Sequence, residues 1–160
     1  MQINFIYDPS VSLAPAGFTT ALNMVAQAAQ ADFTDPITVN IEVGWGEVNG
    51  QPLASGNIGE GAPNLSNVQG LTFGQLKTDL MQHATSIADV IAIDNLPASD
   101  PTNGGLIYLS SAQQKALGLL PANNTAIDGF VGFAAMPLWD FNPSAGISPS
   151  LYDFFGRCGA

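Results

Sequence analysis

An alternating apolar pattern from Ile37 to Val43 constrains the fold more than any other stretch of the sequence. Every second residue in it is β-branched and apolar, and the residues between them are polar or charged. Because successive side chains of a strand point to opposite faces, this spacing predicts a β-strand with one buried face. The strand continues toward Trp45, and the Asn49-Gly50 pair that follows predicts a tight turn.

Three further strands and three helices are expected around this strand. Apolar residues at spacings of three and four predict one helix from Pro15 to about Ala31 and another from Thr72 to about Ile93. Thr72 and Gln75 have the spacing of a capping box at the start of the second helix. The shorter elements are strands over 3–7, 106–109 and 129–133 and a small helix over 110–117 that Gly118 ends.

The stretch 51–70 is rich in Gly, Asn, Ser and Pro, so we expect a long surface loop there. Strands that alternate with helices predict an α+β fold, in which a mixed β-sheet is packed by two longer helices and one short helix. The chain of 160 residues has no internal repeat and no linker, and it therefore fits a single domain over 1–160.

The charge balance limits the partners of the chain. Three Lys and Arg residues stand against thirteen Asp and Glu residues, which gives a formal net charge of −10. Phosphate binding needs clustered cations, so we expect no nucleic-acid partner. No apolar run reaches the length of a membrane helix, which predicts no membrane span. The acidic, Lys-poor composition suits a secreted bacterial protein, although the first residues lack the pattern of a signal peptide.

The residues themselves predict no complete catalytic site. His83 is the only histidine and Cys158 the only cysteine, and a distant pair of this kind does not indicate a zinc site. We interpret His83 as a structural or partly exposed helix residue. The remaining candidates are interpreted as solvated or turn-capping residues rather than acid–base groups or calcium ligands: Glu42, Glu47, Glu60, Asp140, Asn142 and Asp153.

Five segments resemble, in their order and spacing, the N-terminal portion of a family of bacterial secreted zinc metalloproteases of the zincin type. They read INFIYDPSVSLAPAGFTTALNMVAQ, DPITVNIEVGWGEVNGQPLASGNIGE, LPASDPTNGG, DGFVGFA and SPSLYDFFG. The match runs from about residue 2 to Gly156. It implies a zincin-like N-terminal subdomain, a peptide or protein substrate, a secreted location, and hydrolysis by a zinc ion that a His-Glu-x-x-His helix holds in the parent family.

The resemblance also implies a substrate-binding strand. It likens 129–134 to the edge strand along which an extended peptide pairs, so the candidate substrate-binding residues are Gly129, Phe130, Val131, Gly132, Phe133 and Ala134. After Gly156, where the family continues into its zinc helix, the chain reads Arg157-Cys158-Gly159-Ala160. No catalytic or metal-binding residue is therefore carried over, and we expect no zinc to bind this chain.

The ending suggests a hypothesis about the gene. With suitable synonymous codons, one base inserted before Gly-Val-Ala-Ala-His-Glu yields Gly-Arg-Cys-Gly-Ala and a stop. We therefore expect a truncated metalloprotease-like domain that is inactive alone, with 157–160 an aberrant tail. The alternative is a complete non-catalytic peptide-binding or structural domain of a secreted bacterial protein. Without the zinc helix, which would cover part of the sheet, we expect an exposed apolar patch that favours self-association. Its members are Phe130, Phe133, Trp139, Phe154 and Phe155.

Overall fold

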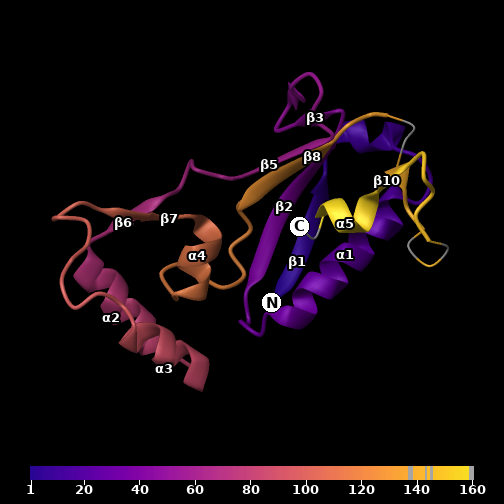
Figure 1. Cartoon of the computed structure of the whole chain (residues 1–160). Coiled ribbons are helices and arrows are strands. Elements are labelled where there is room, and N and C mark those ends of the chain that lie inside the picture. Colours follow the sequence, from indigo (N-terminus) through magenta and orange to yellow (C-terminus); the bar gives the residue numbers. More distant parts are fainter. Residues whose placement is uncertain (137–138, 143, 145, 159–160) are drawn as a thin grey trace.

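A four-stranded mixed sheet forms the centre of the protein (Figure 1). The computed structural model describes residues 1–136, 139–142, 144 and 146–158. The strand order is β1-β2-β8-β5, in which the first three strands are parallel and β5 is antiparallel to β8. These strands are β1 (Gln2–Tyr7), β2 (Thr38–Trp45), β8 (Gly129–Phe133) and β5 (Gly59–Pro63). The predicted α+β fold with a mixed sheet is confirmed.

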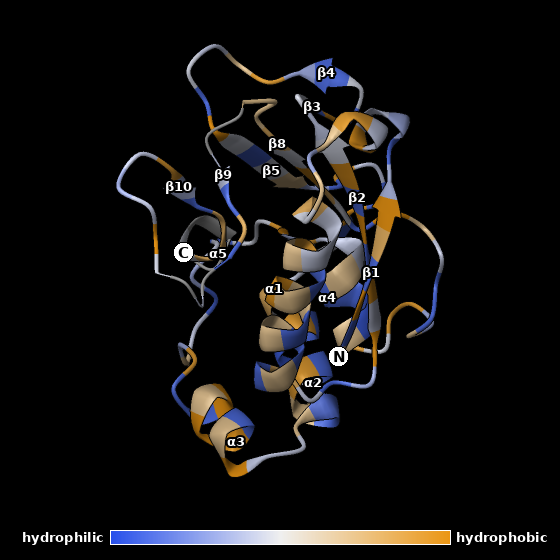
Figure 2. Ribbon diagram, turned by 90° about the vertical axis from the view of Figure 1, so that its right-hand side faces the viewer, coloured by the Kyte–Doolittle hydropathy of each residue, from blue (hydrophilic) through white to orange (hydrophobic). Residues whose placement is uncertain are grey.

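Helix α1 (Phe18–Asp32) covers one face of the sheet, which we call the inner face (Figure 2). The fully buried Phe18 ring meets the rings of Trp45 and Phe133 edge-on, at centroid distances of 4.9 Å and 5.4 Å. Aromatic rings favour this geometry because the positive edge of one ring faces the negative face of another. The main core therefore lies between α1 and the C-terminal halves of β2 and β8. No helix in the described part of the chain, α1 included, is both long and apolar enough to span a membrane.

Helix α1 begins at Phe18 and not at the predicted Pro15. A 3-10 helix, η1 (Pro9–Leu13), precedes it, and Asp8 caps η1 by accepting a hydrogen bond from the Ser10 N–H. Gly17 then has a φ of 99°, a left-handed conformation in which an α-helix cannot continue. The helix therefore starts only after this glycine.

The second predicted helix, expected to reach about Ile93, is two helices: α2 (Phe73–His83) and α3 (Ile87–Asp94). The expected capping box at the start of α2 is present. A second capping box, formed by Ser86 and Asp89, starts α3. Ser86 has an extended backbone, so one continuous helix cannot pass through it.

The stretch 51–70 contains three strands, so the prediction of a long loop is wrong. They are β4 (Gln51–Pro52), β5 and β6 (Gln69–Leu71). β4 pairs with β3 (Glu47–Val48) across the predicted Asn49-Gly50 turn, in which both residues have positive φ. β5 is largely exposed, so it needs no alternating apolar residues and carries none that would have identified it as a strand.

A smaller lobe lies beside the sheet and contains α2, α3, α4 and a two-stranded ribbon (Figure 1). The ribbon pairs β6 with β7 (Ile107–Leu109), and α4 (Ser111–Ala116) follows it as predicted. The lobe has its own small hydrophobic cluster, built on Leu71, Leu109 and Leu117. This cluster is separate from the main core, so apolar packing within the lobe does not by itself hold the lobe against the sheet.

The C-terminal aromatic residues lie mostly inside the protein, which corrects the predicted exposed patch. β9 (Trp139–Asp140) pairs with β10 (Tyr152–Asp153), and α5 (Phe154–Cys158) lies against α1. These elements fold back onto the core and bury three members of the expected patch: Phe133, Trp139 and Phe154. Phe130 and Phe155 are half-buried. Of the predicted tail 157–160, the first two residues continue the backbone of α5, and 159–160 lie outside the described residues.

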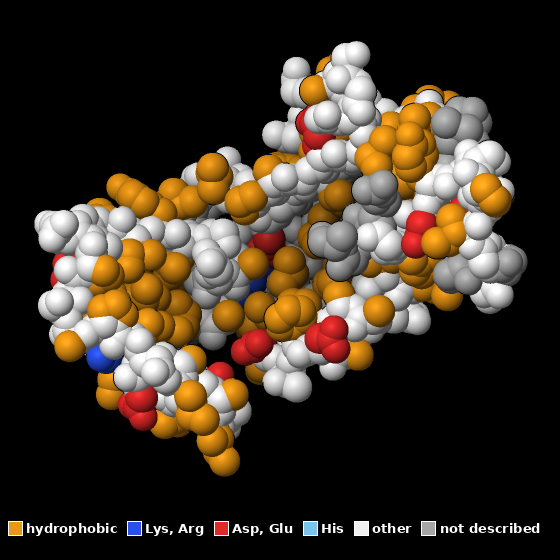
Figure 3. All heavy atoms as spheres, viewed as in Figure 1, with side chains coloured by type: hydrophobic (Ala, Val, Ile, Leu, Met, Phe, Trp, Pro, Cys, Tyr) orange, Lys and Arg blue, Asp and Glu red, His pale blue; other side chains and the backbone are white. Residues whose placement is uncertain are grey.

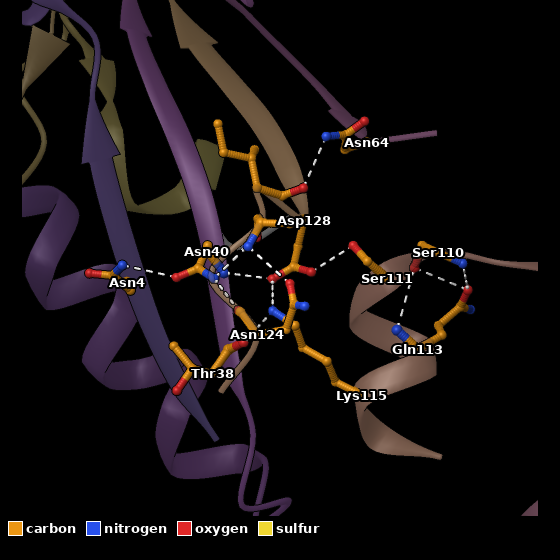
Figure 4. A network of polar contacts seen from close by, with 12 residues as sticks. Asn4, Thr38, Asn40, Asn64, Ser110, Ser111, Gln113, Lys115, Asn124 and Asp128 are labelled. Carbon is orange, nitrogen blue, oxygen red and sulfur yellow. Dashed lines mark hydrogen bonds and ion pairs between the residues drawn. The ribbon is translucent and has the colours of Figure 1, made fainter. Parts of the chain in front are cut away.

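A buried ion pair links α4 to the sheet (Figure 4). Lys115 Nζ lies 2.6 Å from Asp128 Oδ2, and water reaches at most 1% of either side chain. Lys115 also donates a 2.9 Å hydrogen bond to the carbonyl of Thr38, at the start of β2. The Asp128 carboxylate accepts from the Asn40 N–H at 2.8 Å and from the Ser111 hydroxyl at 2.6 Å. Both buried charges thus have the partners that burial requires.

Asn40 extends this network to the turn before β8. Its side-chain amide donates to the carbonyls of Asn124 and Ala126 at 2.9 Å and 3.1 Å. Its side-chain oxygen accepts from Asn4 on β1 at 2.9 Å. These hydrogen bonds hold the turn against β2, and they therefore help to fix the register in which β8 pairs with β2.

Replacing Lys115 with Met should destabilise the protein by about 3–5 kcal/mol, because the Asp128 carboxylate would remain buried without its cation. Lys77→Met on α2 is the matched control, because Lys77 is partly exposed and forms no ion pair with any described side chain. Its expected effect is within about 0.5 kcal/mol. Urea unfolding measures both changes, and similar losses in the two variants would contradict the role given to the ion pair.

Candidate functional site

β8 is a central strand, so the prediction that Gly129–Ala134 forms the substrate-binding edge is wrong. β8 pairs in parallel with β2 on one side and antiparallel with β5 on the other. Ala134, just after β8, donates its N–H to the carbonyl of Ile58 at 2.9 Å. The segment predicted as a loop thus supplies β5, which takes the edge position that the prediction had assigned to β8.

Hydrogen bonds at the two ends of β5 show which of its backbone groups face outward. Before β5, the Ile58 carbonyl accepts from Ala134; after it, the Asn64 N–H donates to the Asp128 carbonyl at 2.8 Å. Residue pairs in an antiparallel ladder alternate between hydrogen-bonded and non-hydrogen-bonded. The even-numbered positions of β5 therefore bond to β8, and its odd-numbered positions direct their N–H and C=O groups away from the sheet.

The outward-facing positions are Gly59, Gly61 and Pro63, and all three are exposed. Each glycine presents an N–H and a C=O, whereas Pro63 presents only a C=O. The missing donor of Pro63 costs the sheet no hydrogen bond, because it lies on the free side of an edge strand. None of the described strands pairs with this side of β5. The edge therefore offers an unpaired backbone template for another strand.

The opposite edge of the sheet, β1, is partly closed. The Ile3 N–H faces away from β2 and donates to Oε1 of Gln30 at 2.7 Å. Gln30 belongs to α1, so a side chain of the covering helix takes the place of a neighbouring strand. The contrast identifies β5 as the open edge.

An apolar groove of about 750 Å³ runs beside β5, between the inner face of the sheet and α1. Figure 3 shows a hollow at this place, next to the lobe that contains α2 and α3, with hydrophobic side chains inside it. Aliphatic and aromatic side chains line most of the groove, among them Ile3, Phe5, Leu22, Val25, Ile41 and Val131. A chain added to β5 would therefore place some of its side chains in apolar surroundings.

The glycines of β5 leave the groove open at the edge. Gly59 and Gly61 pair with Phe133 and Val131, which pack in the core on the inner face. Paired residues share a face, so side chains at the two glycine positions would point into the same space. A Cβ at Gly61 would have ordinary contacts, at 3.4 Å from the Phe130 carbonyl oxygen and 4.0 Å from Val131. Alanine is therefore tolerated at this position.

Glu47 fastens the β3–β4 hairpin to the outer face of the sheet. Its backbone carbonyl lies directly over Gly132 and its carboxylate over Gly44, so a Cβ at either glycine would overlap it. The same carboxylate accepts a 3.2 Å hydrogen bond from the Ser10 hydroxyl. Glu47 is thus a half-buried group packed against the sheet, and not the solvated residue that the sequence predicted.

Glu42 lies on β2 and is half-buried instead of solvated as predicted. Burial raises the pKa of Glu42, and the negative charges of Asp8 and Glu47 raise it further. No described cation pairs with this carboxylate. The fold therefore disfavours the charged form of Glu42.

The carboxylates near the C-terminus cap turns, as predicted. Asp140 accepts hydrogen bonds from the N–H groups of Ser148 and Asn142 at 3.0 Å and 2.9 Å, and these bonds lower its pKa. Asp153 accepts from the Phe155 N–H at 3.0 Å. The carboxylate oxygens of Asp140 and Asp153 thus accept hydrogen bonds from backbone N–H groups.

The described side chains do not fit the zinc site that the family resemblance implies for the parent enzymes. His83 is exposed on α2, as predicted, and its Nδ1 lies 2.9 Å from the Asp79 carbonyl of the same helix. Among the described residues, no group of three His, Cys, Asp or Glu side chains is placed to hold a metal ion. Zinc sites in proteins use three or four such ligands. We therefore derive no zinc chemistry from these residues, and the absence of zinc binding stays a prediction.

No family model, curated protein or solved structure matches the chain. The resemblance to zincin-type metalloproteases therefore depends on the five sequence segments alone and stays a prediction.

Replacing Glu42 with Gln should raise the melting temperature at pH 7. A raised pKa means that the folded protein holds the Glu42 proton more tightly than the unfolded chain does. Glu42 therefore favours folding below its unfolded pKa, and this contribution is lost as the pH rises through the folded pKa. Thermal unfolding should show a difference between Glu42→Gln and the parent at pH 7 that closes toward about pH 3. Equal melting temperatures at pH 7 would contradict the surroundings assigned to Glu42.

Proposed function

We propose that this chain binds extended peptides by adding them as a further strand to the open edge of β5. The observation that carries the proposal is the row of outward N–H and C=O groups at Gly59 and Gly61, beside an apolar groove. In strand addition, backbone hydrogen bonds supply affinity for any extended segment, and alternate side chains supply specificity. The β5 edge offers both parts of this mode of recognition.

The resemblance to zincin-type metalloproteases supports the same proposal. It implies a secreted, metallopeptidase-like domain that holds a peptide substrate along an edge strand, and in this chain the open edge strand is β5. The sequence contains a single histidine, so its own residues do not supply the two histidines of that family's zinc helix. The proposed activity is therefore binding of a peptide without its hydrolysis.

Gly61→Pro should weaken peptide binding at least about five-fold, because proline removes one outward N–H donor from the edge. The Gly61 N–H makes no bond to β8, so its loss leaves the ladder intact. Gly61→Ala is the matched control, because alanine keeps the donor and adds only a methyl group. Fluorescence anisotropy with labelled Gly-Thr-Val-Lys-Val-Thr-Gly measures the affinities.

Equal affinities of the Gly61→Pro variant and the parent would place the binding site elsewhere. Circular dichroism checks that both variants are folded. If the proline variant unfolds, the same test is made on the parent protein with a peptide N-methylated at alternate residues. N-methylation on the bonding side of the peptide should abolish binding, and methylation on the other side should not.

The purified chain, supplied with zinc, should hydrolyse a chromogenic peptide no faster than buffer does, because its own residues offer no paired histidine ligands. Mass spectrometry of the peptide after prolonged incubation detects slow cleavage. Cleavage that a chelator abolishes and zinc restores would overturn the proposal of binding without hydrolysis.

A further inference from the structure

The sheet fixes the side-chain directions of any strand added to β5. Residues directly opposite one another on neighbouring strands point to the same face, and successive residues alternate between faces. Ligand residues opposite Gly59 and Gly61 would therefore point to the inner face, and the residue between them, opposite Glu60, to the outer face. Glu60 points to the outer face because it pairs with Gly132, and the outer side of Gly132 is the side on which Glu47 packs.

The two inner-facing ligand side chains would enter the groove. Gly59 and Gly61 bring no side chains of their own, so the space next to the edge is left for the ligand. The wall across the groove is formed by Leu22, Val25 and Ala26 of α1. Burying apolar groups against such a wall is favourable, whereas polar groups would lose their water without gaining partners. The groove therefore selects apolar side chains at two positions separated by one residue.

Glu60 gives the outer face a negative charge between these two positions. Its Oε1 accepts hydrogen bonds from the Ala54 N–H at 2.8 Å and from Asn57 Nδ2 at 2.6 Å. Both donors are neutral, and no described side chain forms an ion pair with Glu60. Opposite charges on directly opposed strand residues attract, and like charges repel. The residue opposite Glu60 is therefore favoured as a cation.

We propose that the preferred ligand of the β5 edge is an extended segment with the pattern apolar, Lys or Arg, apolar. This inference depends on the proposed function, because it names the class of peptide that the same edge selects. The net charge of −10 agrees with a cationic ligand. The specific prediction is that the cation belongs between the two apolar residues and pairs with Glu60.

The test compares four labelled peptides on the intact chain by fluorescence anisotropy. The reference is Gly-Thr-Val-Lys-Val-Thr-Gly. In two of the other peptides the central Val-Lys-Val is replaced by Val-Glu-Val or by Thr-Lys-Thr. In the fourth peptide the three central residues are reordered to Lys-Val-Val. We expect the Val-Glu-Val peptide to bind about five-fold more weakly than the reference and the Thr-Lys-Thr peptide about ten-fold more weakly. The reordered peptide controls for general attraction between a cation and an acidic protein.

Glu60→Gln is the matched protein variant, because glutamine keeps an Oε1 acceptor for Ala54 and Asn57 and removes only the charge. In this variant the preference for Lys over Glu should fall below about two-fold, and the preference for valine over threonine should remain. Added salt should reduce the Lys preference of the parent in the same way.

The outcomes separate this inference from the proposed function. If all peptides bind equally and Gly61→Pro still weakens them, the edge binds peptides without this selectivity, and only the inference is overturned. If Glu60→Gln leaves the Lys preference unchanged, or if the reordered peptide binds as well as the reference, the pairing with Glu60 is overturned. If no peptide binds, the proposed function and the inference fail together.

Discussion

The ion pair between Lys115 and Asp128 is the interaction on which the placement of the lobe against the sheet depends. Lys115 belongs to α4, which follows the ribbon of the lobe, and Asp128 directly precedes β8. The Asp128 carboxylate also receives the Asn40 N–H of β2, and its backbone carbonyl receives the Asn64 N–H at the end of β5. One buried residue thus positions the lobe, the central strand and the open edge together. Loss of the Lys115 ammonium would leave the Asp128 carboxylate buried without its cation, at the point where the three elements meet.

The parts of the fold that could be predicted from the sequence have local signals. The strand through Val43 shows period-two alternation, the start of α2 shows a capping box, and the β3–β4 turn shows Asn49-Gly50. The break between α2 and α3 also had a local signal, Ser86 and Asp89, but the apolar periodicity across it favoured one helix. The ion pair had none, because its two residues meet only after the sheet and α4 have formed.

The sequence did not predict which strand forms the candidate site. The family resemblance implied a peptide-binding edge strand, yet which strand lies at the edge depends on the pairing of 59–63 with 129–133. No local pattern reports a pairing between segments so far apart. The exposed β5 lacks apolar alternation, and the remaining clue was Pro63 beside two alternating glycines, a composition that a sheet tolerates only at its edge. The same exposure that makes β5 hard to recognise leaves it free to bind.

The composition of β5 also affects whether two copies of the protein can pair through their β5 edges. Two β5 strands that met antiparallel with Glu60 at the centre would place two carboxylates opposite each other. A register centred on Gly61 would instead set Gly59 opposite Pro63, which has no N–H to donate. These two symmetric registers are therefore penalised by charge or by a lost hydrogen bond, whereas a foreign strand with a cation opposite Glu60 meets no repulsion there. An edge that is open to a ligand is in this way a poor template for edge-to-edge aggregation.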